Sequence, residues 1–214
     1  MADSLIRHYA LQHEMIAPFV PKSTSALEDG RKVASYGLST AGYDIRLGRN
    51  FIFYRGEENK IINFRRGDVW DSMVIPSLPK AIIDPNNFDP VLVVQIDDVD
   101  EIIIPPKTFF MGVSQEYIRV PRNVKVTCDG KSTCARSGLI FYVTPLEPGW
   151  MGFITLEFNN SNDALLRLLP GMGISQLEFK LLNTEPEIAY CDRNGKYQGQ
   201  GPQPIPPKQH TPSE

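Results

Sequence analysis

The stretch that decides the fold is EPGWMGFITLEFNN, residues 147–160. Between Gly152 and Phe158 it is rich in β-branched, aliphatic and aromatic residues, and the pairs Pro148-Gly149 and Asn159-Asn160 bound it. A short apolar run between such turn residues is typical of a β-strand. The stretch therefore predicts a strand that is closed by turns at both ends.

Runs of the same kind recur along the chain, each bounded by Pro, Gly, Asn or Asp. They cover Gly48–Tyr54, Ala81–Ile83, Val91–Ile96, Glu101–Ile104, Thr108–Val113, Val124–Cys128, Leu139–Thr144, Ile174–Leu182 and Glu187–Tyr190. Leu165–Leu169 favours a further strand over a helical turn, because Pro170 and Gly171 follow it. So many short strands predict an all-β sandwich or distorted barrel.

The two ends of the chain depart from this β pattern. From Ser4 to Ile16 apolar residues recur at helical spacing after a serine N-cap, which predicts one amphipathic helix. Residues 194–214 are rich in Gly, Pro and Gln and poor in aliphatic side chains, which is typical of a flexible tail. We expect one domain over residues 1–193 and a tail over 194–214. The segment 59–79 matches no motif.

Composition and charge exclude several classes of protein. The chain has 214 residues, 42% of them hydrophobic, with 22 basic and 25 acidic side chains and a formal charge of −3. No basic stripe is present, so we expect no nucleic acid polymer as partner, although a single nucleotide needs only a few cations. No stretch is long and apolar enough to span a membrane, and the first residues are polar, so we expect a cytoplasmic protein.

Cysteine and histidine patterns indicate no metal site. The three cysteines form no CxxC pair, and the histidines, His8, His13 and His210, lie only near the two ends. Reduced thiols and surface histidines are therefore expected rather than a disulfide framework or a zinc site.

Glu157 interrupts the apolar run of the opening stretch, between Leu156 and Phe158. If it is buried, its pKa rises toward neutrality, which suits a group that accepts and returns a proton. The alternative is a solvent-facing glutamate on the polar side of an alternating strand.

Two further clusters combine small, polar and charged residues. One is AGYDIRL, residues 41–47, and the other is GKSTCARSG, residues 130–138. In the second, small residues would let backbone N–H groups approach phosphate oxygens while Lys131 and Arg136 supply charge. A solvated turn is the alternative, because the spacing is not that of a Walker A loop.

Five motifs in order, AGYDIRL, GKSTCAR, VTPLEPGWMGFITLEFNNS, GMGISQLEF and YCDRNGKYQGQ, resemble those of the dCTP deaminases, a branch of the trimeric dUTPase superfamily. The resemblance runs from residue 36 to Gln200. It implies a dUTPase-like distorted β-barrel or jelly-roll with an N-terminal helix, a C-terminal tail that closes over the site, and a homotrimer with sites at subunit boundaries.

The resemblance implies zinc-independent conversion of dCTP to dUTP and ammonia, which supplies dUMP and dTTP synthesis. Glu157 would activate the water that attacks C4 of cytosine and relay its proton to the amine, while Ser132 and Arg136 hold and polarise that water. The expected nucleotide-binding residues are Lys131, Ser132, Thr133, Cys134, Ala135, Arg136, Glu147, Thr155, Leu156, Glu157, Gln176, Tyr190, Lys196 and Gln200. Mg²⁺ is expected with the triphosphate, held by phosphate and water more than by protein.

The sequence departs from the family at two places. An Ala-His-Arg element that many bacterial deaminases carry before this turn is missing, which puts feedback inhibition by dTTP in doubt, and Glu147 replaces the family's Asp. A bifunctional enzyme that yields dUMP, a dUTPase and a non-catalytic nucleotide-binding regulator are the alternatives. The HxE and PCxxC signatures of zinc deaminases are absent.

Overall fold

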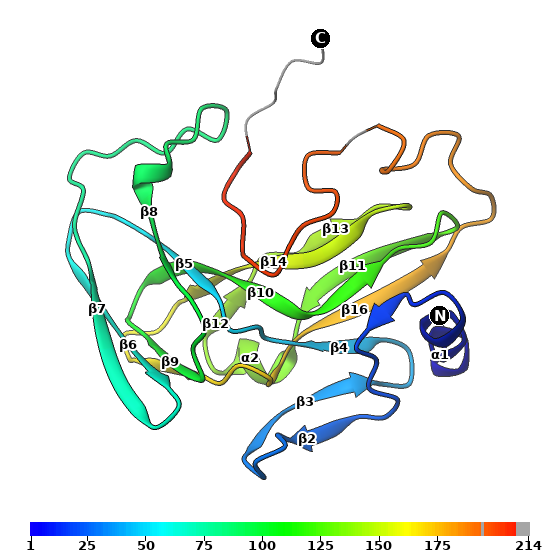
Figure 1. Ribbon diagram of the computed structural model, residues 1–214, viewed down its shortest axis with the longest axis horizontal. Helices are drawn as coiled ribbons and strands as arrows, with labels where there is room; N and C mark the ends of the chain where they lie inside the picture. Colours follow the sequence, from blue (N-terminus) through cyan, green and yellow to red (C-terminus); the bar gives the residue numbers. More distant parts are fainter. Residues whose placement is uncertain (194, 209–214) are drawn as a thin grey trace.

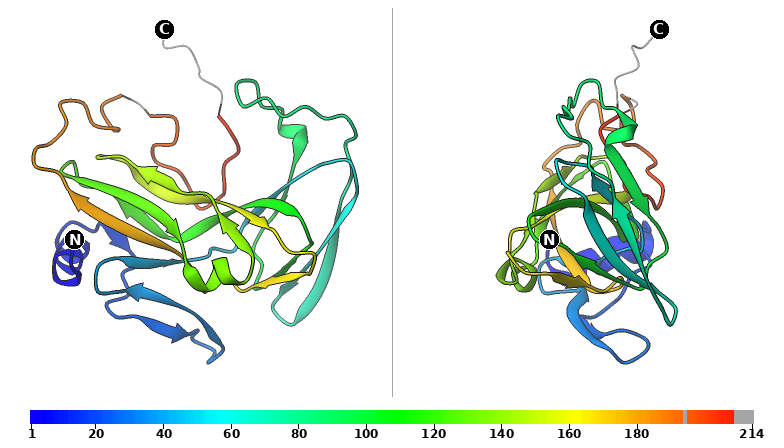
Figure 2. Two further views of the ribbon diagram at one scale, coloured as in Figure 1. Left: turned by 180° about the vertical axis from the view of Figure 1, so that it is seen from behind. Right: turned by 90° about the vertical axis from the view of Figure 1, so that its left-hand side faces the viewer.

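The structure is a computed structural model that describes residues 1–193 and 195–208. It is mainly β, and its strands form three sheets (Figure 1). Helix α1 (Asp3–Gln12) lies at one end of the molecule and the β6–β7 hairpin lies at the other (Figures 1 and 2).

The first sheet carries the opening stretch of sequence as its strand β14. Its order is β12-β14-β10-β5-β8, with β1 added to β10. The strands are β1 (Ile16–Ala17), β5 (Phe51–Tyr54), β8 (Val93–Ile96), β10 (Thr108–Arg119), β12 (Leu139–Phe141) and β14 (Met151–Asn160). Antiparallel pairing places Met111 of β10 opposite Glu157.

The second sheet has the order β13-β11-β16-β4-β3-β2. Its strands are β2 (Thr24–Ala26), β3 (Lys32–Leu38), β4 (Tyr43–Arg46), β11 (Val124–Gly130), β13 (Thr144–Leu146) and β16 (Gly173–Leu181). A short helix, α2 (Ser132–Arg136), follows β11 and leads into β12, so it connects the first two sheets.

The third sheet has the order β15-β9-β6-β7. Its strands are β6 (Lys60–Arg66), β7 (Val69–Ile75), β9 (Glu101–Ile104) and β15 (Leu166–Leu168), and the 3-10 turn η1 (Pro90–Leu92) precedes β8. On β6, Ile62 and Phe64 are buried while Ile61 is exposed, so this hairpin covers one end of the core.

An irregularity in β10 fixes the strand that carries the site. The pairing of β10 with β14 shifts between Val113 and Tyr117. There the Ser114 hydroxyl donates to the carbonyl of Glu116 (2.7 Å) and accepts from the N–H of Ile154 (2.8 Å). A side chain thus replaces a missing backbone partner, which keeps the buried polar groups of β14 satisfied.

The prediction of a mainly β fold with an N-terminal helix is confirmed, and no closed barrel forms among the described strands. The helix ends at Gln12 rather than near Ile16, because Glu14 adopts a positive φ of 48° and Ile16 pairs with Ile118 of β10. Such a left-handed residue commonly ends a helix.

Two predicted strands do not form, and the ends of others differ from the prediction. Ala81–Ile83 and Glu187–Tyr190 form no strand, and Ile82 is 84% exposed, because neither run finds a partner strand. The run from Val91 begins with η1, whose Asp89 side chain accepts the Val91 N–H. The run Leu139–Thr144 divides between β12 and β13, and the uninterpreted segment 59–79 contains the β6–β7 hairpin.

Candidate active site

A cavity of about 420 Å³ lies over the face of β14 that carries Thr155 and Glu157. Its walls come from β5, β10, β13 and β14 and from the chain after residue 189. They are Tyr54, Phe109, Met111, Thr144, Pro145, Leu146, Glu147, Trp150, Ile154, Thr155, Glu157, Tyr190, Tyr197, Gln200, Ile205 and Pro207. Among these described residues the only charged side chains are Glu147 and Glu157, so the cavity suits an apolar or neutral group.

Glu157 reaches this cavity because buried and half-buried residues alternate along β14. Leu156 and Phe158 face the core, whereas Glu157 is half-buried on the other face. Thr144 Oγ1 donates to Glu157 Oε2 at 3.3 Å. Burial raises the pKa of the Glu157 carboxyl, and the Glu157 N–H and the Thr144 hydroxyl oppose that rise. A carboxyl with a raised pKa can exchange a proton near neutral pH.

The β12 edge of β14 leaves a gap beside Thr155. The Phe153 N–H donates to Gln200 O (2.9 Å), and the Glu157 carbonyl accepts from the Tyr142 N–H (3.1 Å) on the same edge. Alternate residues of a strand direct their backbone groups to the same edge, so Thr155 points its N–H and C=O between these two contacts. Among the described residues we find no backbone partner for Thr155 there.

Three residues near the C-terminus, Tyr190, Tyr197 and Gln200, close one side of the cavity. Trp150 Nε1 donates to Tyr197 O (3.0 Å), and the Tyr197 N–H donates to the Tyr190 hydroxyl (3.0 Å). Glu147, at the rim, forms an ion pair with Arg193. The predicted site residues Glu147, Thr155, Glu157, Tyr190 and Gln200 therefore line one cavity.

A second cluster gathers around Asp44 of the AGYDIRL motif, which is 4% exposed. Lys131 Nζ lies 2.5 Å from Asp44 Oδ2, and Gln176 Nε2 donates to Asp44 Oδ1 at 3.1 Å. The predicted residues Lys131 and Gln176 thus share one carboxylate, although neither lines the Glu157 cavity. The charge-assisted contact with Asp44 fixes the Lys131 side chain at the start of α2.

Helix α2 presents a polar surface. Ser132, Thr133, Ala135 and Arg136 are exposed. Among the described residues we find no hydrogen bond or ion pair that engages the Arg136 guanidinium or connects it to Glu157. Cys134 is buried, and burial raises the pKa of its thiol to about 11.

The predicted residues thus form two separate groups. The first, with Glu157, lies in the cavity; Leu156 sends its side chain into the core and directs its backbone groups toward β10, opposite Gly112, rather than toward the gap beside Thr155. The second consists of α2 with Lys131 and Gln176. Lys196 is half-buried in the segment after Tyr190 and does not line the Glu157 cavity. Within one chain the structure does not bring Ser132 and Arg136 to Glu157.

Several lining residues were missed by sequence reasoning. Tyr54, Phe109 and Met111 belong to strands whose apolar residues pass for core, and Ile205 and Pro207 lie in a segment predicted to be flexible. Thr144 belongs to the VTPLEPGW motif but was not among the expected site residues. Its spacing of thirteen residues from Glu157 gave no sign that the two side chains meet.

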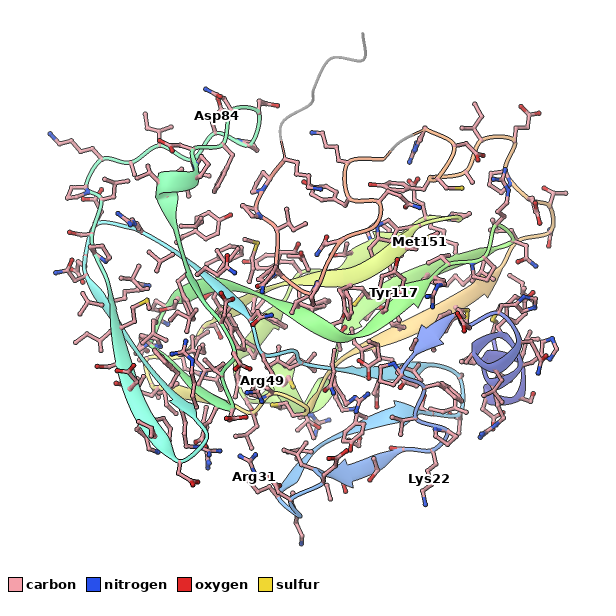
Figure 3. All side chains as sticks on the ribbon, in the orientation of Figure 1. Lys22, Arg31, Arg49, Asp84, Tyr117 and Met151 are labelled. Carbon is pink, nitrogen blue, oxygen red and sulfur yellow. The ribbon has the colours of Figure 1, made fainter. Side chains whose placement is uncertain are left out.

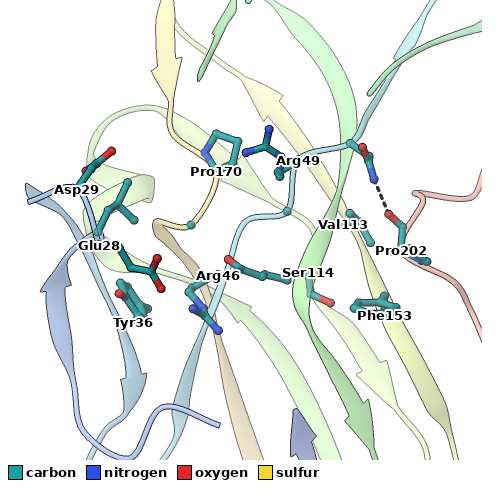
Figure 4. A pocket seen from close by; sticks show the side chains of 15 residues that line it. Glu28, Asp29, Tyr36, Arg46, Arg49, Val113, Ser114, Phe153, Pro170 and Pro202 are labelled. Atoms are coloured by element: carbon teal, nitrogen blue, oxygen red, sulfur yellow. Dashed lines mark hydrogen bonds between the residues drawn. The ribbon is translucent and has the colours of Figure 1, made fainter. Parts of the chain in front are cut away.

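A second cavity, of about 540 Å³, lies beside Arg46 and Arg49 (Figure 4). It contains none of the predicted site residues, so we place the chemistry in the smaller cavity. In the described part of the chain, no group of three or more His, Cys, Asp or Glu could hold a metal ion, and no helix is long and apolar enough to cross a membrane.

The mainly β architecture with its N-terminal helix is that of the dUTPase-like fold. A crystal structure of 2'-deoxycytidine 5'-triphosphate deaminase from Agrobacterium tumefaciens matches with a TM-score of 0.52 at 14% identity, over 85% of this chain and 47% of that one. This chain therefore spans about half the length of that protein. At this identity the match shows the fold alone.

The chain belongs to the dCTP deaminase-like family, whose model matches residues 5–182. A dCTP deaminase of Burkholderia mallei is 40% identical over 199 residues, which cover 93% of this chain and 94% of the relative. One from Burkholderia thailandensis is 39% identical over the same shares. The resemblance drawn from the five motifs is confirmed.

Proposed function

We propose that the protein is an enzyme that hydrolyses dCTP to dUTP and ammonia without zinc, with Glu157 as general base. The observation that carries this is the half-buried Glu157 carboxyl with a raised pKa, in a cavity that can hold a nucleoside. Family membership supplies the substrate class.

In the proposed reaction Glu157 takes a proton from water as the water oxygen bonds to C4 of cytosine. The carboxyl then gives this proton to the exocyclic nitrogen. The C4–N bond breaks and ammonia leaves. The proton of the C4 hydroxyl then moves to N3, which forms the C4 carbonyl and the N3–H of dUTP. The raised pKa of Glu157 matches both halves of this transfer.

The unpaired edge at Thr155 suits recognition of the base. A pyrimidine presents donors and acceptors along one edge, and the N–H and C=O of Thr155 are complementary to such a pattern. The gap between Gln200 and Tyr142 thus offers the cytosine a fixed position at Thr155, two residues along β14 from Glu157.

The separation of the two groups of residues supports a homotrimer with shared sites. A triphosphate needs cations, yet none of the described residues that line the Glu157 cavity is a cation and Arg193 at its rim is paired with Glu147, whereas Arg136 is exposed on α2. We propose that α2 of a neighbouring copy brings Ser132 and Arg136 to Glu157, with closed cyclic symmetry. Mg²⁺ would accompany the triphosphate, bound mainly by phosphate and water. The reaction would serve cytoplasmic supply of dUMP and dTTP.

The test is an assay with dCTP, CTP, dCMP, dUTP and 5-methyl-dCTP, with nucleotide products separated chromatographically and ammonia measured. We expect stoichiometric dUTP and ammonia from dCTP and no reaction of dUTP. Release of dUMP from both dCTP and dUTP would show a bifunctional enzyme, and dUMP from dUTP alone a dUTPase. Tight dCTP binding without any product would indicate a regulator.

A further inference from the structure

Residues 200–208, here called the C-terminal strap, cross the face of β14 that carries the site. Gln200 forms a parallel bridge with Gly152, and Figure 1 shows the strap, in red, beginning beside β14 and running toward the C-terminus. Just before it, Gln198 Oε1 accepts the N–H of Met151, labelled in Figure 3, at 3.3 Å. Gln200 and Pro204 are buried, although composition predicts a flexible segment here.

The strap is held along its whole length. Asn50 Nδ2 donates to Pro202 O at 2.8 Å (Figure 4), and Gln95 Nε2 donates to Gln203 Oε1 at 2.9 Å. The N–H of Lys208 lies 3.4 Å from the Tyr197 hydroxyl. These contacts come from residues far apart in the sequence, so the path of the strap is fixed by the fold.

Thr155 joins the strap to the site. Its hydroxyl oxygen accepts from Gln200 Nε2 and from the Ile205 N–H, at 3.1 Å for the latter, which uses both of its acceptor positions. Thr155 is two residues from Glu157 on the same face of β14, about 7 Å along the strand. The backbone of Ile205, which contacts Thr155, therefore lies about one two-residue step of β14 from the Glu157 carboxyl.

The proline content of the strap lowers the entropy cost of holding it on the site. Pro202, Pro204, Pro206 and Pro207 occupy four of the six positions from 202 to 207. Proline restricts the unfolded chain, so less conformational entropy is lost when the strap lies down. With the strap in place the cavity still measures about 420 Å³, so the strap is a wall of the cavity and leaves it open to a ligand.

We propose that Ile205 is a specificity-determining residue that packs on the base and sugar of the nucleotide and limits the size of the substrate. Ile205 and Pro207 supply the wall, and Tyr54, Phe109 and Met111 are the apolar walls that β5 and β10 add. Because none of the described lining residues is a cation, the cavity would receive the uncharged end of the nucleotide. The proposal rests on the proposed function, which supplies dCTP as the ligand.

The test compares Ile205→Ala with Ile205→Leu, and with Ile82→Ala as a matched control at a position 84% exposed outside the cavity. Removing three carbons from a contact surface should raise KM for dCTP about tenfold. We expect kcat/KM for 5-methyl-dCTP to fall less, so that discrimination between the two substrates relaxes about threefold or more. Ile205→Leu should stay near wild type, as should Ile82→Ala.

A second measurement separates this proposal from the proposed function. Binding of dCTP is measured by calorimetry in the Glu157→Gln background, with and without Ile205→Ala. A Kd that rises about tenfold supports the wall even if the native protein releases no ammonia. If KM, Kd and the preference for dCTP over 5-methyl-dCTP all stay unchanged, Ile205 is no wall, while deamination by the native protein would still stand.

Discussion

Arg46 and Glu116 form the most deeply buried ion pair in the described part of the protein. Arg46 Nε lies 2.6 Å from Glu116 Oε1, the Arg46 N–H donates to Oε2 at 2.8 Å, and the Glu116 side chain is fully buried. Burial raises the pKa of Glu116, and the contacts with Arg46 oppose that rise. The pair stands next to Ser114, where β10 and β14 are joined.

Replacing Arg46 with Met should destabilise the protein by about 3–5 kcal/mol, because it leaves a buried carboxylate without its partner. Urea unfolding at fixed protein concentration measures this. Adding Glu116→Leu to the same chain should restore part of the loss. A single variant within about 1 kcal/mol of wild type would show that the pair contributes little.

Thr144 is a positioning residue for Glu157. Thr144→Val removes the donor that favours the charged carboxylate, so the pKa of Glu157 should rise further and the acid limb of the rate profile should move to higher pH. Thr144→Ser should return the limb to its wild-type position. A Thr144→Val profile with the same limb and only lower kcat would point to a merely structural role.

At the scale of elements, the sequence predicted the strands that have partners in the fold better than it predicted the segments around them. β14 was predicted nearly to its ends because apolar alternation and turn residues coincide there. Residues 81–83 have the same composition but no neighbouring strand, and pairing between distant segments cannot be read from a local pattern. The C-terminal strap shows the converse, since its order comes from Asn50, Gln95 and Thr155 rather than from its own composition.

The site was predictable in part for the same reason. The motifs named Glu157, Thr155 and Gln200, and the structure places these three at one cavity. They could not show that α2 lies apart from Glu157 in the same chain. That arrangement depends on the crossing from β11 to β12, which no spacing of motif residues encodes.

Two truncations separate the roles of the C-terminal segment. Removing everything after Tyr190 should leave a folded protein that binds and deaminates dCTP poorly, with a lower Tm because the buried Gln200 and the Trp150–Tyr197 contact are lost. Removing only the residues after Gly201 should keep those contacts and cost less activity. Thermal unfolding and kcat/KM measure both effects. If the deletion after Tyr190 kept wild-type kcat/KM, the C-terminal segment would have no role in binding or turnover of dCTP.

At the scale of the whole molecule, the proposed homotrimer with shared sites predicts complementation between inactive subunits. Arg136→Ala and Glu157→Gln proteins should each be inactive as pure trimers. Mixed under subunit exchange, they should recover about a quarter of wild-type activity, since one boundary in four would pair an intact Arg136 with an intact Glu157. Recovery is measured by ammonia release, with the trimer verified by light scattering. No recovery despite proven exchange would place both residues in one chain's site.

Glu157→Gln tests the central claim most directly, with dCTP turnover and thermal unfolding measured on the same preparation. The amide cannot accept the proton of water, so turnover should fall by about 10²–10⁴ or more while dCTP still binds. A raised carboxyl pKa contributes stability that is fully present below the unfolded pKa and is lost as pH rises through the folded pKa. The variant should therefore melt above wild type at neutral pH. Turnover within about tenfold of wild type would contradict Glu157 as the general base.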